Sequence, residues 1–152
     1  DSPDCEFQLL GSVDVAYPNH VAEERVNDDH EKGYIRYLGY QPDVNRYIEC
    51  ADCIVLPSYH EGLSRVLMEG LAMGKPIITT NIPGCRETVA DGQNGFLVQP
   101  RSTESLIEAV RKFLSLSNRE RDAMGKFSRK LAEEIFDIRE VIKVYKKITG
   151  SI

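Results

Sequence analysis

The stretch at residues 53–80 reads CIVLPSYHEGLSRVLMEGLAMGKPIITT and contains two strand-like runs separated by a helical one. The first run, residues 53–56, is short and apolar, and the second, residues 77–80, is β-branched throughout. The segment between them carries apolar residues at helical spacing, namely Leu63, Val66, Leu67 and Leu71, which predicts a helix at about residues 63–73. Gly74 ends this pattern and Pro76 follows as a stop signal. A strand, a helix and a strand in this order predict a βαβ unit with parallel strands.

The same alternation extends outward from this unit along most of the chain. Further strands are predicted at residues 5–10, 34–38 and 96–98. Helices are predicted at residues 43–49 and 85–90, after Ser102, and at residues 119–135 and 138–148. The sequence therefore predicts an α/β fold with a doubly wound parallel sheet. Residues 16–32 are polar and ambiguous, and Asp28-Asp29-His30 is interpreted as part of a solvated loop.

Composition excludes some classes of function. The chain has 152 residues, 41% of them hydrophobic, which suits one soluble domain with a substantial core. Its formal charge of -5 argues against nucleic-acid binding, because that needs a basic surface to displace counterions. Cys50 and Cys53 form a C-x-x-C, but no second Cys or His pair accompanies them, so we expect buried structural residues and no metal.

The turn before the predicted helix is a candidate phosphate site. Ligands of doubly wound sheets bind at the carboxyl ends of the strands, where this turn lies. The first amides of a helix are unpaired and sit at the positive end of its dipole. The candidates here are the amides of Gly62, Leu63, Ser64 and Arg65. Gly62 lacks the Cβ that would obstruct close approach of a ligand.

Two carboxylates flank this turn and invite two interpretations. Glu61 and Glu69 are eight residues apart, which corresponds to about 12 Å along a helix. That separation suits the two ends of an extended ligand, such as a sugar and a ribose. The alternative is that Glu69 pairs with Arg65 at i, i+4 on a solvated face. Beside them, His60 is interpreted as an exposed turn residue and not as a general base.

Residues 61–78, EGLSRVLMEGLAMGKPII, resemble the Glu-x7-Glu motif of family-4 retaining glycosyltransferases. Flanking pieces match the family in order: Arg36-Tyr37-Leu38-Gly39, Ala51-Asp52, Leu56-Pro57-Ser58, Pro83-Gly84, Glu87 and DGQNGFLV at residues 91–98. The resemblance covers about residues 7–114 and implies the Rossmann-like C-terminal domain of a GT-B enzyme. It implies transfer of a sugar from a nucleotide diphosphate sugar, with retention, to a polysaccharide, glycolipid or other glycan acceptor.

The resemblance also implies roles for individual residues. Glu61 would contact the transferred sugar and Glu69 the ribose hydroxyls. The backbone at Gly62, Leu63 and Ser64 would also contact the sugar, and the amides at Ser64, Arg65 and Val66 would stabilise the departing β-phosphate. The backbone of Leu38, Gly39 and Tyr40 would meet the base, and Gly84 belongs to the same donor site. Such enzymes need no metal and no cofactor, because helix amides supply the electrostatic stabilisation.

The family's domain normally opens with another strand and helix, which carry an Arg and a Lys for the diphosphate. The resemblance places residue 1 after that segment and after an acceptor-binding N-terminal domain. We therefore expect residues 1–152 to be a fragment of the nucleotide-sugar-binding domain, with 119–152 as its C-terminal helices and no turnover alone. We expect a cytoplasmic enzyme, with peripheral contact at the inner membrane face through Lys143, Lys146 and Lys147 as an option.

Two rival interpretations remain open at this point. One is another GT-B enzyme, such as a sugar-nucleotide epimerase. The other is a non-catalytic nucleotide-binding α/β module, for which nucleotide binding would survive the loss of Glu69 and of Gly62.

Overall fold

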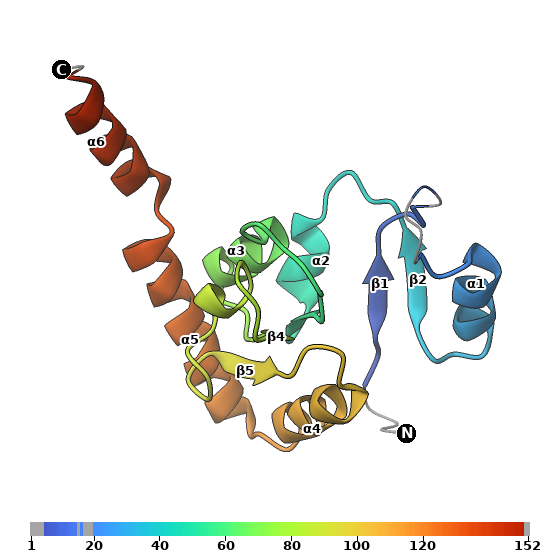
Figure 1. Ribbon diagram of the computed structural model, residues 1–152. Helices are drawn as coiled ribbons and strands as arrows, with labels where there is room; N and C mark the ends of the chain where they lie inside the picture. The colour runs from blue at the N-terminus through green and yellow to red at the C-terminus, as the bar shows by residue number, and fades with distance from the viewer. Residues whose placement is uncertain (1–4, 15, 17–19, 151–152) are drawn as a thin grey trace. The chain divides into compact units, whose positions relative to one another are not determined.

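The computed structural model describes residues 5–14, 16 and 20–150 (Figure 1). The chain forms two compact units, Asp1–Val44 and Asn45–Ile152. The expectation of a single domain over residues 1–152 stays a prediction.

The first unit holds two parallel strands and one helix. Strand β1 (Gln8–Leu10) pairs with β2 (Arg36–Gly39), and α1 (Glu23–Glu31) packs beside β2. The prediction of a loop at Asp28, Asp29 and His30 was wrong, because all three lie in α1. Only Val26 of this helix is buried, so no apolar stripe marked it. Ion pairs one turn apart stabilise it instead, joining Arg25 to Asp29 and Lys32 to Asp28.

The second unit is built on a three-stranded parallel sheet in the order β3-β4-β5. Strand β4 (Ile77–Thr80) is buried throughout and lies between β3 (Ile54–Leu56) and β5 (Gly95–Val98). The registers pair Ile54 with Ile77 and Ile77 with Gly95. The predicted α/β class with parallel strands is confirmed.

Helices cover both faces of this sheet, because alternate strand residues point to opposite sides. Ile77 packs against Leu67 and Leu71 of α3 (Arg65–Ala72). The next residue, Ile78, packs with Phe96 against Phe113 of α4 (Thr103–Leu114). This coverage of both faces is the doubly wound arrangement that the sequence predicted.

The remaining elements of this unit are α2 (Asn45–Cys50), the 3-10 helix η1 (Arg86–Thr88), α5 (Asn118–Ile135) and α6 (Ile138–Thr149). The predicted helix at residues 85–90 is thus one short 3-10 turn. Cys50, predicted to be buried, is exposed at the end of α2, whereas Cys53 packs against the Ile78 cluster. Among the described residues, no cluster of three or more His, Cys, Asp or Glu side chains could hold a metal ion.

Helices α3 and α5 approach closely where two glycines meet. Gly74 follows α3 in a left-handed conformation (φ 68°), and a Cβ on Gly125 of α5 would lie 2.4 Å from the Gly74 carbonyl oxygen. Arg129 of α5 donates to the carbonyl of Ala72, the last residue of α3. The C-terminal end of α3 is therefore fixed against α5.

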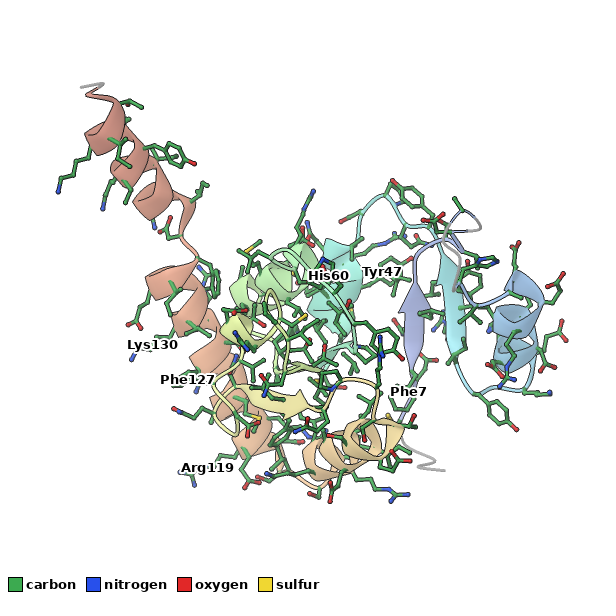
Figure 2. All side chains as sticks on the ribbon, in the orientation of Figure 1. Phe7, Tyr47, His60, Arg119, Phe127 and Lys130 are labelled. Carbon is green, nitrogen blue, oxygen red and sulfur yellow. The ribbon has the colours of Figure 1, made fainter. Side chains whose placement is uncertain are left out.

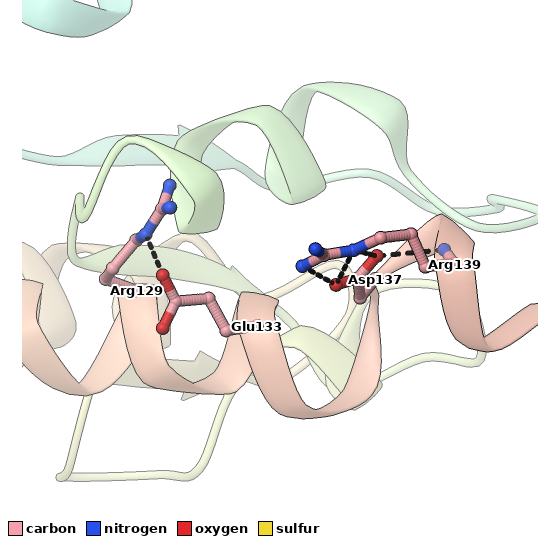
Figure 3. Close-up of polar contacts among 4 residues, drawn as sticks. All are labelled: Arg129, Glu133, Asp137 and Arg139. Atoms are coloured by element: carbon pink, nitrogen blue, oxygen red, sulfur yellow. Dashed lines mark hydrogen bonds and ion pairs between the residues drawn. The ribbon is translucent and has the colours of Figure 1, made fainter.

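Figure 3 shows the end of α5 and the start of α6, with the ion pair of Arg129 and Glu133. Asp137 caps α6 by accepting from the amide of Arg139 at 2.8 Å, and it also accepts from the Arg139 guanidinium. These bonds, the guanidinium contact first, lower the pKa of Asp137 to about 2. Within the described part of the chain, no helix combines the length and apolarity needed to cross a bilayer.

Candidate functional site

The carboxyl ends of β3 and β4 meet at one edge of the three-stranded sheet, because the strands are parallel. Two buried threonines of β4 fix the chain that leaves β3. Thr79 Oγ1 donates to the carbonyl of Leu56 at 2.7 Å, and Thr80 Oγ1 donates to the carbonyl of Ser58. The segment that leads to Glu61 therefore leaves the sheet along a defined path.

The N-terminus of α3 stands at this edge without a side-chain cap. Its N-cap residue, Ser64, is 3% exposed, yet its side chain accepts no bond from the helix. Helices α4, α5 and α6 differ, because Ser102, Ser117 and Asp137 cap them. Among the described residues, no partner is seen for the amides of Arg65, Val66 and Leu67. The start of α3 thus presents three open donors, with the positive end of the helix dipole behind them.

One of the predicted phosphate-binding amides is already engaged. The amide of Ser64 donates to the carbonyl of Gly84 at 3.0 Å. Of the three amides assigned to the β-phosphate, those of Arg65 and Val66 are therefore open. The amide of Leu67 is a third open donor, which was not among the predicted ones. The predicted helix start at Leu63 also lies two residues early, because α3 begins at Arg65. Leu63, which the predicted apolar stripe included, is 48% exposed.

Gly84 is the residue where a side chain would interfere with this loop. It has φ of 87°, and a Cβ on it would lie 2.2 Å from the carbonyl oxygen of Gly62 and 2.6 Å from that of Glu61. By contrast, a Cβ on Gly62 would meet nothing within 4 Å. The backbone of the turn at residues 82–85 therefore touches the Glu61-Gly62 backbone, and only glycine permits this contact.

Glu87 of η1 contacts the same turn. Its Oε2 accepts from the amide of Gly84 at 2.8 Å, and its Oε1 accepts from Arg86 at 3.3 Å. A bond from its own backbone amide, the Gly84 amide and the nearby Arg86 charge lower the pKa of Glu87, although partial desolvation opposes the shift. In the sequence, Glu87 stands out only through the family resemblance, and no local pattern predicts these bonds.

Glu69 and Arg65 form the ion pair that the sequence left as an alternative. Arg65 Nε donates to Glu69 Oε1 at 3.0 Å. The Arg65 side chain is 88% exposed and that of Glu69 is 33% exposed. Such a solvated pair contributes about 0–1 kcal/mol, so a ligand that offers either partner a better contact could replace it.

Glu61 and His60 both lie in the segment between β3 and α3. His60 is labelled in Figure 2. Glu61 is half-buried, and no partner for its carboxylate is found in the described part of the chain. His60 is exposed, as predicted, and its carbonyl accepts from Ser58 Oγ at 3.1 Å.

Leu38, Gly39 and Tyr40 belong to the first unit, at the end of β2. The carbonyl of Leu38 accepts from Gln41 Nε2 at 2.7 Å, and that of Gly39 accepts from the Gly11 amide at 2.9 Å. Gly39 has φ of 62°, and Tyr40 is 74% exposed. Their assignment to the base stays a prediction.

A cavity of about 390 Å³ lies elsewhere in the second unit, beside the turn that precedes β4. It is lined by Lys75, Arg121, Lys126, Arg129 and their neighbours, and by none of the predicted site residues. The candidate site is therefore the open α3 N-terminus with its flanking carboxylates, not this cavity.

Comparison with known proteins places the sequence in one family. The model for glycosyl transferases group 1 matches residues 1–116. Spore coat protein SA from Bacillus subtilis is 29% identical over 158 residues, covering 97% of this chain and 42% of that protein. The N,N'-diacetylbacillosaminyl-diphospho-undecaprenol alpha-1,3-N-acetylgalactosaminyltransferase of Campylobacter jejuni is 30% identical over 106 residues, covering 70% of this chain and 27% of that enzyme.

The fold has solved counterparts as well. The structure of HepE from Anabaena in complex with UDP aligns with a TM-score of 0.85 at 19% identity, covering 99% of this chain and 42% of that one. The chain thus spans about two fifths or less of these relatives. Because the family model matches residues 1–116 of 152, the chain belongs to the group 1 family of glycosyl transferases.

Proposed function

We propose that this chain is the donor-binding part of a retaining glycosyltransferase. Its substrate is a nucleotide diphosphate sugar, and the sugar passes to a polysaccharide, glycolipid or other glycan acceptor. The observation that carries the proposal is the uncapped N-terminus of α3, with three open amides at the carboxyl edge of a parallel sheet. Family membership and the UDP complex of the structurally similar HepE support a nucleotide diphosphate as the ligand.

The proposed reaction uses these amides to stabilise the leaving group. As the bond between sugar and β-phosphate breaks, negative charge develops on the phosphate oxygens. The amides of Arg65, Val66 and Leu67 are held by the helix before any reaction, so they stabilise that charge without rearranging. The acceptor hydroxyl then attacks from the side that the diphosphate leaves and gives its proton to the departing phosphate oxygen, so the configuration at the anomeric carbon is retained.

Glu61 and Glu69 are proposed to hold the two ends of the donor. The half-buried carboxylate of Glu61 has no partner among the described residues, so it is free to accept hydrogen bonds from the transferred sugar. Glu69 is proposed to accept from the ribose hydroxyls. This requires it to exchange its bond to Arg65, which is inexpensive for a solvated pair. Arg65 is then free to contact the diphosphate.

The proposed enzyme is also described by its cofactors, its acceptor and its location in the cell. Helix amides supply the positive potential, so the reaction is proposed to need neither a metal nor a cofactor. A lipid-linked acceptor fits the diphospho-undecaprenol in the name of the Campylobacter relative. We also propose a cytoplasmic enzyme at the inner membrane face, supported by Lys146 and Lys147 in the last turn of α6.

Isothermal calorimetry with a matched pair of variants tests the proposal. UDP, GDP and ADP are titrated into the protein, followed by sugar conjugates of the nucleotide that binds. Glu69→Gln and Glu133→Gln each remove one exposed i, i+4 ion pair with an arginine, but only Glu69 lies in the site. We expect Glu69→Gln to lower the affinity for the preferred nucleotide about tenfold, because a charge-assisted hydrogen bond is lost. We expect Glu133→Gln to leave this affinity unchanged.

The outcome separates the proposal from a non-catalytic module. Equal affinities for Glu69→Gln and Glu133→Gln would remove Glu69 from the site. Absence of any nucleotide binding at millimolar concentration would contradict the donor-binding function of the chain.

A further inference from the structure

We propose that Glu87 is a positioning residue of the donor site, acting through Gly84 on the N-terminus of α3. Glu87 does not touch the donor. It anchors the turn whose carbonyl fixes the first residue of that helix. The inference rests on the proposed function, because its effect on ligands is measured at the same α3 amides.

The first contact joins Glu87 to the turn. Glu87 Oε2 accepts from the Gly84 amide at 2.8 Å, across three residues of chain. Its second oxygen, Oε1, faces the Arg86 guanidinium at 3.3 Å. Because the carboxylate is engaged on both sides, its charge is balanced locally and is not directed at an anionic ligand.

The second contact joins the turn to the helix. The carbonyl of Gly84 accepts from the amide of Ser64, the N-cap residue of α3, at 3.0 Å. Both residues are buried, so the bond is shielded from water. The chain of contacts therefore runs from a carboxylate to the Gly84 amide, and from the Gly84 carbonyl to Ser64.

The middle residue explains why an anchor is needed. Gly84 is in a left-handed conformation (φ 87°), and as a glycine it has the widest backbone freedom of any residue. The backbone contact with Glu61 and Gly62 leaves no space for a stiffer residue at this position. The hydrogen bond from the Gly84 amide to the Glu87 carboxylate restricts the turn and requires no side chain at position 84.

The position of the Gly84 turn affects the groups that are proposed to bind the ligand. Ser64 directly precedes the open amides of Arg65, Val66 and Leu67, and it follows the loop that carries Glu61. A turn that drifts would release the Ser64 amide and let that loop move relative to α3. We therefore expect Glu87 to influence affinity for the diphosphate more than affinity for the nucleoside.

Amide hydrogen exchange tests the anchor without any ligand. It is measured for Glu87→Ala, for Glu87→Gln and for the control Arg86→Ala, which removes only the exposed ion pair. We expect the Ser64 amide to exchange about tenfold faster in Glu87→Ala, as for a buried hydrogen bond that is weakened. Glu87→Gln retains an acceptor and should restore most of the protection. The amide of Ile78, in the buried strand β4, reports whether the fold is intact.

Affinity for UDP and for uridine, or for whichever nucleotide the wild type prefers, gives the second measurement. We expect Glu87→Ala to lower the affinity for the diphosphate about tenfold and to leave the affinity for the nucleoside unchanged. Unchanged Ser64 exchange in Glu87→Ala overturns the inference, as does faster exchange with unchanged diphosphate affinity. A wild type that binds no nucleotide contradicts the proposed function instead, while the exchange data still decide whether Glu87 anchors the turn.

Discussion

Substitution of Gly84 by alanine is the sharpest perturbation of the candidate site. At φ of 87° an alanine is strained by about 1–2 kcal/mol. Its Cβ would also lie 2.2 Å from the Gly62 carbonyl oxygen and 2.6 Å from that of Glu61, where backbone must move. Overpacking of this kind costs about 1–3 kcal/mol. We therefore expect Gly84→Ala to lower the free energy of unfolding by about 2–5 kcal/mol.

Gly92→Ala is the matched control for backbone strain. Gly92 has a similar φ of 76°, but a Cβ there would meet nothing within 4 Å. In urea denaturation, Gly92→Ala should lower the free energy of unfolding only by the cost of the backbone strain, about 1–2 kcal/mol. If the Glu61-Gly62 loop shifts to relieve the contact, Gly84→Ala loses less stability but should lose diphosphate affinity. Equal stability and equal nucleotide affinity for the two variants would refute the close contact and the role assigned to it.

Two further predictions concern stability away from the site. Asn94 is fully buried; its Oδ1 accepts from the Ala90 amide at 2.8 Å, and its Nδ2 donates to the carbonyl of Thr88 at 3.0 Å. Asn94→Ala should lower the free energy of unfolding in urea by about 2–4 kcal/mol, because it leaves buried polar groups unpaired. A loss below about 0.5 kcal/mol would contradict these hydrogen bonds. The pKa of Asp137 is lowered from 3.8 to about 2, so its cap on α6 should be fully present above pH 3.8 and lost as the pH falls through about 2. An NMR titration of the Asp137 carboxyl carbon checks this, and a midpoint near 3.8 would exclude the bond to Arg139.

The βαβ unit could be predicted from sequence because its signals are local. Two short strand-like runs, a stripe at helical spacing and a glycine stop are read from residues a few positions apart, although only β4 of the two strands is buried throughout. Gly74 does follow α3 in a left-handed conformation, and Leu67 and Leu71 are fully buried, as that stripe predicted.

The errors have physical causes. Helix α1 buries a single residue and gains its order from ion pairs such as Arg25 with Asp29, which apolar periodicity does not detect. The start of α5 was predicted one residue late, although Ser117 and Glu120 form a capping box that the sequence displays. This Ser-x-x-Glu pattern indicates the start of the helix.

The candidate site was predictable in composition but not in detail. Its two glutamates follow from the motif, and the start of its helix was predicted to within two residues. The bond between Ser64 and Gly84 does not, because it joins segments twenty residues apart and depends on how two loops of the folded sheet meet. The same holds for Glu87, whose function depends on a backbone amide and leaves no trace in residue spacing.

The proposed function requires that the open amides of α3 bind the diphosphate of a nucleotide sugar. The most direct measurement is an amide-resolved NMR titration of the chain with UDP, GDP, ADP and their sugar conjugates. We expect saturable shifts for the amides of Arg65, Val66 and Leu67, and a smaller shift for Ser64, whose amide donates to the Gly84 carbonyl. Saturable shifts confined to other parts of the chain, with these three amides unmoved, would contradict it.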